Sequence, residues 1–319
     1  MSERTTDGAR RGGLATYAWL VTGFNLFVIL WGAYVRASFS GDGCGSHWPL
    51  CDGSVVPAAH LVKTMIEFAH RATSGLALLL VVGLAVQSVR AYPRGHRVRR
   101  AALFSLLFII FEALVGAALV KFGLVARDDS AARALVMSFH LVNTFLLLAS
   151  LALTALWAGG GARVRLSGQG AVAPLYAAAW LGALLLAMSG ATTALGDTLS
   201  RSIPATHFLI RLRVLHPAIA VVVGCYCVML SSYVANFLRP GARVRRCANA
   251  LATLFAVQVG VGILNVTLLA PVWLQLTHLL LADLFWIALV LTSAAALSAE
   301  FAAEPGGETT PARTLPRTA

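Results

Sequence analysis

The sequence predicts an all-α membrane protein that crosses the bilayer several times. Of its 319 residues, 58% are hydrophobic and only 12% are charged, with a mean hydropathy of +0.78. Soluble domains carry about 25% charged residues, so a soluble enzyme, a disordered chain and a fibrous repeat are excluded. The apolar runs are continuous rather than alternating, which predicts helices instead of the strands of a membrane barrel.

Eight apolar segments are long enough to span the hydrocarbon layer, which takes about 20 residues in a helix. The first is too long for a signal peptide and has no small-residue cleavage site, so we expect it to be a membrane helix. The predicted spans are 16–37, 66–89, 101–124, 135–157, 173–195, 213–237, 248–270 and 275–298.

The basic residues predict the orientation. The formal net charge is +12, and 16 of the 25 Lys and Arg residues fall in the tails and in the loops that follow even-numbered spans. Cytoplasmic loops are enriched in Lys and Arg, so both termini are expected on the cytoplasmic side of the cell membrane. The segments 38–65, 125–134, 196–212 and 271–274 then lie outside. The net positive charge is therefore explained by the orientation of the protein in the membrane, and no nucleic-acid partner is expected.

The chain reads as two pseudo-repeated four-helix bundles. Glu112 in span three and Gln258 in span seven each precede a glycine by four residues, and Gly-Ala pairs occur at matching depths of spans one and five. The predicted organisation is a cytoplasmic N-tail 1–15, a first bundle 16–157, an inner linker 158–172, a second bundle 173–298 and a disordered cytoplasmic tail 299–319.

Four of the eight histidines lie at the outer ends of the even-numbered spans: His70, His140, His216 and His278. A single such histidine is often just hydrogen-bonded to a backbone carbonyl, but that account does not explain one per even span at matched depth. Facing imidazoles in a four-helix bundle are typical axial ligands of haem iron. We therefore expect two haem sites, His70 with His140 and His216 with His278.

Three acidic residues lie within the spans. Glu67 precedes His70 by three residues, so both face the same way, and it is a candidate catalytic acid. The alternative is an ion pair with Arg71 or Lys63. Glu112 is expected to form a hydrogen bond, and Asp283 to orient a haem propionate or bond across helices.

Two cysteines, Cys44 and Cys51, lie in the first outer loop with six residues between them. The spacing and the oxidising compartment permit a disulfide, which could be a structural clip or a redox-active dithiol. Cys225, Cys227 and Cys247 are interpreted as packing residues.

Taken together, these residues resemble the haem A synthase family, over about residues 17–298. The resemblance rests on Gly-Ala-Tyr-Val-Arg at 32–36, the Cys-x6-Cys loop with Trp-Pro-Leu-Cys, Glu-x-x-His-Arg at 67–71 and the three later histidines. The chain has His47 where many members have Asp, so no acid is expected to act there.

The resemblance implies oxidation of the C8 methyl group of haem O to a formyl group, giving haem A for aa3-type oxidases. It implies that His70 and His140 bind the substrate haem, that Glu67 is the essential acid, and that His216 and His278 bind haem b. It also implies a Cys44–Cys51 disulfide, an upstream haem O synthase, a quinone or other membrane electron acceptor, and cytochrome oxidase assembly factors. The sequence is also compatible with a homo-oligomer.

Two alternatives remain open on the sequence. A di-haem b-type cytochrome that only passes electrons explains the four histidines, but not Glu67 or the cysteine pair. A transporter built from a duplicated bundle predicts broken helices and paired charges near the midplane, and histidines at the outer edge fit it poorly.

Overall fold

The computed structural model describes residues 2–57, 61–200 and 202–301. Eight helical spans in it are long and apolar enough to cross a membrane, and the described residues form no β-strand apart from two isolated bridges. The predicted all-α, multi-pass fold is therefore confirmed. The helices are α1 Ser2–Ala37, α2 Val62–Ala91, α3 Arg97–Lys121, α4 Ala131–Ala158, α5 Val172–Leu199, α6 Phe208–Leu212, α7 Leu215–Tyr233, α8 Ala242–Thr267 and α9 Val272–Ala296.

The bounds of all eight spans differ from the prediction by a few residues, and two spans differ in a further way. Helix α1 begins at Ser2, so residues expected in the N-tail extend the helix ahead of the first span, Gly12–Ala37. The sixth span is composite: α6, α7 and a π-helical turn Val234–Leu238 follow one another. Hydropathy cannot find such a break, because the apolar residues continue through it. The tail predicted to be disordered lies outside the described residues from 302 onward.

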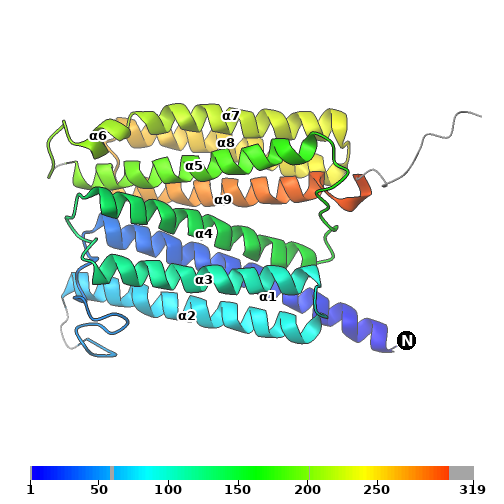
Figure 1. Cartoon of the computed structure of the whole chain (residues 1–319), viewed down its shortest axis with the longest axis horizontal. Coiled ribbons are helices and arrows are strands. Elements are labelled where there is room, and N and C mark those ends of the chain that lie inside the picture. Colours follow the sequence, from blue (N-terminus) through cyan, green and yellow to red (C-terminus); the bar gives the residue numbers. More distant parts are fainter. Residues whose placement is uncertain (1, 58–60, 201, 302–319) are drawn as a thin grey trace, which may run out of the picture.

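The helices lie side by side in one elongated bundle (Figure 1). The start of α1 and the end of α9 lie at one end of it, here called the terminal end, and the loop after α1 lies at the opposite end, here called the loop end. Large side chains such as Leu79 and Val222 are 66% and 70% exposed on the outside of the bundle. Such a surface suits contact with lipid tails.

Within the bundle, neighbouring helices contact one another in two groups. In the first group α1 and α3 each contact both α2 and α4, so α2 and α4 lie diagonally across it. In the second, α7 packs mainly on α5 and α8, and α9 on α8, which leaves α7 and α9 diagonal. Helices α1 and α4 contact α5 and α9 across the seam between the groups.

The seam is closed by a large aromatic contact. Trp286 of α9 is fully buried, donates a 2.6 Å hydrogen bond from Nε1 to the carbonyl of Phe145 in α4, and stacks on the Phe145 ring at 5.2 Å. The two groups therefore form one packed body, with the helices that carry the four histidines at fixed positions within it.

Candidate functional site

His216 and His278 face each other across the second group. They lie near the loop-end starts of the diagonal helices α7 and α9, and their ring centroids are 6.4 Å apart with an interplanar angle of 77°. A nitrogen–metal bond to imidazole is about 2.0 Å, so two rings on opposite sides of one iron have centroids roughly 6 Å apart. This spacing fits a haem iron held by both rings.

Neutral side chains surround this pair. Oγ of Ser189 lies 2.9 Å from Nδ1 of His216, which leaves Nε2 of that ring for a metal. Nε2 of Gln258 donates to the backbone carbonyl of His278 at 3.1 Å and lies 3.4 Å from Nε2 of the His278 ring. Nδ1 of His278 is buried with no hydrogen-bond partner in the described chain.

His70 and His140 occupy the diagonal helices of the first group, and their surroundings differ. Oε2 of Glu112 in α3 lies 2.5 Å from Nδ1 of His140. Thr144, one turn along α4, donates a 2.6 Å hydrogen bond to Oε1 of the same carboxylate. An acidic group thus orients His140 and leaves its Nε2 available for iron.

Glycines pack against three of the four rings. A Cβ added to Gly32 would lie 2.9 Å from Cε1 of His70, and one added to Gly190 or Gly262 would lie 3.2 Å from Cε1 of His216 or His278. Around Gly116, the corresponding position beside His140, nothing lies within 4 Å. Helix α3 thus supplies the acid Glu112, rather than a close glycine, to the fourth ring.

Sequence reasoning assigned Glu112 only a general hydrogen-bonding role. The structure brings Glu112 against Nδ1 of His140, whereas its counterpart Gln258 lies beside Nε2 and the backbone carbonyl of His278. The matching motifs, in which Glu112 and Gln258 each precede a glycine by four residues, are the sequence signal for this contact. Which ring each side chain contacts depends on helix rotation, which the motifs do not specify.

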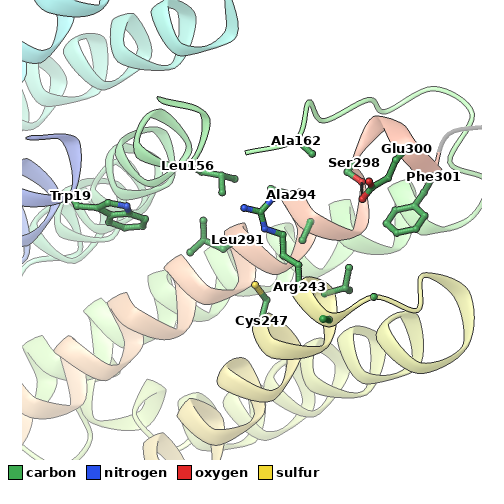
Figure 2. Close-up of a pocket in the computed structure, with 14 residues that line it drawn as sticks. Trp19, Leu156, Ala162, Arg243, Cys247, Leu291, Ala294, Ser298, Glu300 and Phe301 are labelled. Carbon is green, nitrogen blue, oxygen red and sulfur yellow. Dashed lines mark hydrogen bonds between the residues drawn. The ribbon is translucent and has the colours of Figure 1, made fainter. Parts of the chain in front are cut away.

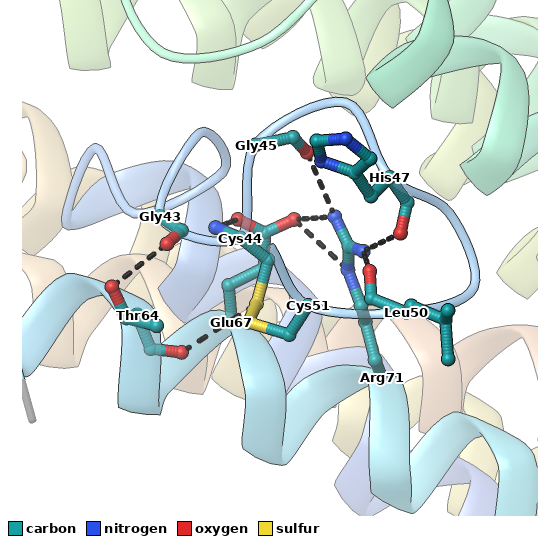
Figure 3. Close-up of a disulfide and its surroundings, with 9 residues drawn as sticks. All are labelled: Gly43, Cys44, Gly45, His47, Leu50, Cys51, Thr64, Glu67 and Arg71. Carbon is teal, nitrogen blue, oxygen red and sulfur yellow. Dashed lines mark hydrogen bonds and ion pairs between the residues drawn. A yellow bond between two sulfur atoms is a disulfide. The ribbon is translucent and has the colours of Figure 1, made fainter. Parts of the chain in front are cut away.

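Glu67 is buried and both of its carboxylate oxygens have partners (Figure 3). Oε2 accepts a 2.8 Å hydrogen bond from the backbone N–H of Cys44, and Oε1 pairs with Nη2 of Arg71 at 2.5 Å. The ion pair with Arg71 that the sequence offered as the alternative is therefore present. Glu67 does not contact a histidine through any of these bonds.

Arg71 extends this anchor across the cysteine loop. It donates hydrogen bonds to the carbonyls of Gly45, His47 and Leu50, and Oγ1 of Thr64 donates to the Gly43 carbonyl at 2.7 Å. The predicted Cys44–Cys51 disulfide is formed, and both cysteines are buried. The loop is thus a closed ring fastened to α2 one turn from His70.

Asp283 is fully buried on α9, and neither of its carboxylate oxygens has a hydrogen-bond partner in the described residues. The cross-helix bond expected for it is not made within that part of the chain. Its position on the face of α9 that also carries Trp286, three residues further on, places it toward the seam with α4.

Two cavities lie away from the histidine rings. One, of about 320 Å³, opens near the terminal end between Trp19, Leu156, Cys247 and Ala294 (Figure 2). From His278 to Ala294 helix α9 rises about 24 Å at 1.5 Å per residue, so this cavity is remote from the paired histidines. The other, of about 280 Å³, lies between the cysteine loop and Lys121 at the end of α3.

No three His, Cys, Asp or Glu side chains gather into a metal-binding cluster in the part of the chain that is described. Haem iron is already held by four porphyrin nitrogens and takes only one or two protein ligands, which pairs of histidines can supply. The diagonal placement of the rings, the 6.4 Å spacing and the glycines that give the rings room all fit such a group.

Fold and site together define a multi-pass helical membrane protein with two diagonal pairs of histidines. The chain belongs to the family described as cytochrome oxidase assembly protein, which matches residues 15–290. The resemblance stated from the motifs is thereby confirmed at the level of the family.

Named relatives add two kinds of similarity. The chain is 52% identical over 295 residues to a protoheme IX farnesyltransferase of Thermus thermophilus, covering 89% of this chain and 48% of that protein. It is 41% identical over 98 residues to a heme A synthase of Halalkalibacterium halodurans, and 43% identical over 98 residues to one of Bacillus cereus. Those matches cover 31% of this chain and about a third of each synthase. The chain thus spans about half the length, or less, of the curated relatives it matches.

Proposed function

We propose that this protein is a haem A synthase, which oxidises the C8 methyl group of haem O to a formyl group for aa3-type oxidases. The observation that carries the proposal is the asymmetry of the two histidine pairs. An acid, Glu112, contacts His140 in the first group, whereas neutral Gln258 and Ser189 contact the rings of the second. The family's description as cytochrome oxidase assembly protein and the relatives named heme A synthase support a role in haem A formation.

In this proposal His70 and His140 hold the iron of the substrate, haem O. The carboxylate of Glu112 lies 2.5 Å from Nδ1 of His140 and Thr144 fixes that carboxylate, so that Nε2 of the ring is the nitrogen left for the iron. A carboxylate against a ligating histidine makes that ligand more basic and favours an electron-poor, oxidised iron. The first pair is therefore the reactive one.

With a membrane quinone as the acceptor, the reaction balances as R–CH3 + H2O + 2 quinone → R–CHO + 2 quinol. The methyl carbon is hydroxylated twice with oxygen from water, each hydroxylation passes two electrons and two protons to one quinone, and the resulting diol loses one water to leave the formyl group. Glu67 is the proposed acid of these steps. Its present contacts are linked to this role, because the bonds to Arg71 and to the Cys44 N–H stabilise the charged carboxylate and weaken when it takes up a proton. The cysteine loop would then loosen from α2, so the chemistry and the movement of the loop are linked.

His216 and His278 are the proposed axial ligands of haem b. Bound there, haem b supplies one-electron redox chemistry. Ser189 fixes the tautomer of His216, while Gly190 and Gly262 let both rings approach without a clashing Cβ. Nothing acidic touches either ring in the contacts described, which suits a group that only relays electrons.

The implied partners follow from this chemistry. A haem O synthase must act first, and the name of the Thermus relative supports such a neighbour. Since the match covers 48% of that protein, we assign farnesyl transfer to its remaining half. A membrane quinone or another membrane acceptor takes the electrons, and oxidase assembly factors receive haem A. The proposed location is a bacterial inner membrane with both termini cytoplasmic.

A di-haem cytochrome that only passes electrons is the competing function, and the contact between Glu112 and His140 favours the synthase over it. The test is co-expression with a haem O synthase in a host that makes no haem A. We expect haem A to accumulate with the wild-type protein and not with His140→Ala. Accumulation of haem O alone, at normal expression of the wild-type protein, would overturn the proposal.

A further inference from the structure

Arg36 crosses from the first helix group into the second at the loop end. It is the last basic residue of α1, and its guanidinium donates to the carbonyl of Ala194 and to Oγ1 of Thr198, both on α5. Nη2 also donates to Oε1 of Gln275 on α9 at 3.2 Å. One side chain of the first group thus binds two helices of the second.

All three of these acceptors are neutral. None of the ion pairs among the described residues includes Arg36, although it is partly buried within the seam. A cation removed from water without an anion is costly, so such a position favours an anionic ligand.

The charges around Arg36 leave a positive excess. Asp197 on α5 lies close enough to act on Arg36 electrostatically, but it already pairs with Arg213 at 2.6 Å. The side chain of Arg213 packs against Gly196 of α5: a Cβ added to Gly196 would lie 3.1 Å from Cδ of Arg213. Arg36, Asp197 and Arg213, here called the loop-end charge cluster, therefore contain two cations against one carboxylate.

The cluster lies one helical turn beyond the second histidine pair. Arg213 precedes His216 by three residues, and Gln275, which holds Arg36, precedes His278 by three. On α9, residues three apart share a face, so Gln275 lies on the face of His278, and Arg213 lies in the turn between α6 and α7, just before the helix that carries His216. The cations therefore lie toward the loop end, on the side of the rings that faces away from the apolar middle of the bundle.

We propose that the loop-end charge cluster binds the propionate carboxylates of the haem held between His216 and His278, with Arg36 as the principal cation. The inference rests on the proposed haem b site. Haem carries two propionates on one edge, and a guanidinium is suited to bind a carboxylate with two parallel hydrogen bonds.

This binding would join the two halves of the molecule. Gly32 lies one turn before Arg36 on α1 and packs against His70 of the other pair. The helix that contacts the substrate site would then also hold the charged edge of the electron-transfer haem. A change in the charge of that haem would then change the electrostatic force on Arg36 and so on α1.

The test compares the purified, haem-loaded full chain with Arg36→Met, Arg36→Lys and Asp197→Asn. A positive charge near the iron stabilises the reduced form, so Arg36→Met should lower the reduction potential of haem b. It should also speed haem transfer to apomyoglobin about tenfold, the effect of losing one charge-assisted hydrogen bond. Arg36→Lys should restore most of both values, and Asp197→Asn should raise the potential.

Thr198→Val is the matched control, because it removes one bond of Arg36 and keeps the cation. It should leave the potential and the transfer rate near wild type. A potential and a transfer rate unchanged in Arg36→Met, or reproduced by Thr198→Val, would overturn the inference. If Arg36→Met does not fold, Asp197→Asn is the deciding variant. A reduction potential of haem b that is unchanged or lowered in Asp197→Asn contradicts the proposal. Wild-type protein without haem b would instead overturn the proposed function itself.

Discussion

The two helix groups place their histidines alike and surround them differently. Each pair lies on diagonal helices at the loop end, and glycines pack against three of the four rings. The difference in charge comes from spans three and seven, which place Glu112 beside His140 and neutral Gln258 beside His278. In the proposed function, a shared scaffold thus holds a reactive site and a relay site that differ in the charge beside one histidine.

The largest expected effect comes from removing a ligand of the first pair. His140→Ala should lower haem A yield by more than about 100-fold, since loss of outer partners of metal ligands alone costs about 10- to 100-fold. Haem b should remain, because its ligands lie in the other group. The measurement is haem extraction and chromatography. An unchanged yield of haem A would remove His140 from the site.

Exchanging the two side chains tests the comparison itself. Glu112→Gln should lower haem A yield about 10- to 100-fold while haem O stays bound, because the ring keeps a partner but loses the acid. The reciprocal Gln258→Glu should lower the reduction potential of haem b, since it places a negative charge beside the His278 ring.

If Glu112→Gln is fully active, the asymmetry has no catalytic meaning. If Gln258→Glu leaves the potential of haem b unchanged, Gln258 and Glu112 do not occupy equivalent positions.

Glu67 has two roles that substitutions can separate. Glu67→Gln should retain haem binding and stall the oxidation at a partly oxidised product, if the carboxylate moves protons. Arg71→Met removes the partner that fastens the loop while leaving the acid in place. It should therefore cost less activity than Glu67→Gln. If Glu67→Gln and Arg71→Met lose the same activity and no partly oxidised haem accumulates, the role of Glu67 is only to anchor the cysteine loop.

The smallest effect is expected from the glycines. Gly262→Ala pushes a methyl group against His278 and should weaken haem b binding by about 1 to 3 kcal/mol, the usual cost of overpacking. Gly116→Ala is the matched control, because nothing lies within 4 Å of its Cβ position. The haem b content of each variant is measured during titration with a competing apoprotein. An equal loss of haem b from Gly262→Ala and Gly116→Ala would contradict the role assigned to Gly262 beside the His278 ring.

Much of the framework could be predicted from the sequence. Hydropathy located the eight spans, and residue type with depth selected the four histidines, because polar rings at membrane depth stand out among apolar residues. The Glu67–Arg71 pair also follows from i,i+4 spacing. These features are local, so one stretch of chain suffices to infer them.

The contacts that distinguish the two groups could not be predicted in the same way. Glu112 on α3 reaches His140 on α4, and Arg36 on α1 reaches Gln275 on α9, so both contacts join different helices. Such contacts depend on the rotation of each helix about its axis and on the packing of the seam, for instance Trp286 against Phe145. The tie from Glu67 to the Cys44 N–H likewise requires the folded loop.

The most direct test of the account is the identity of the haems that each pair holds. Protein made together with a haem O synthase is purified as wild type, as His140→Ala and as His216→Ala, and its haems are extracted and separated. We predict haem B with haem O or haem A in the wild type, haem B alone in His140→Ala, and haem O or haem A without haem B in His216→Ala. Haem B alone in the wild type, or the same haems in all three proteins, would contradict the division into a substrate half and a relay half.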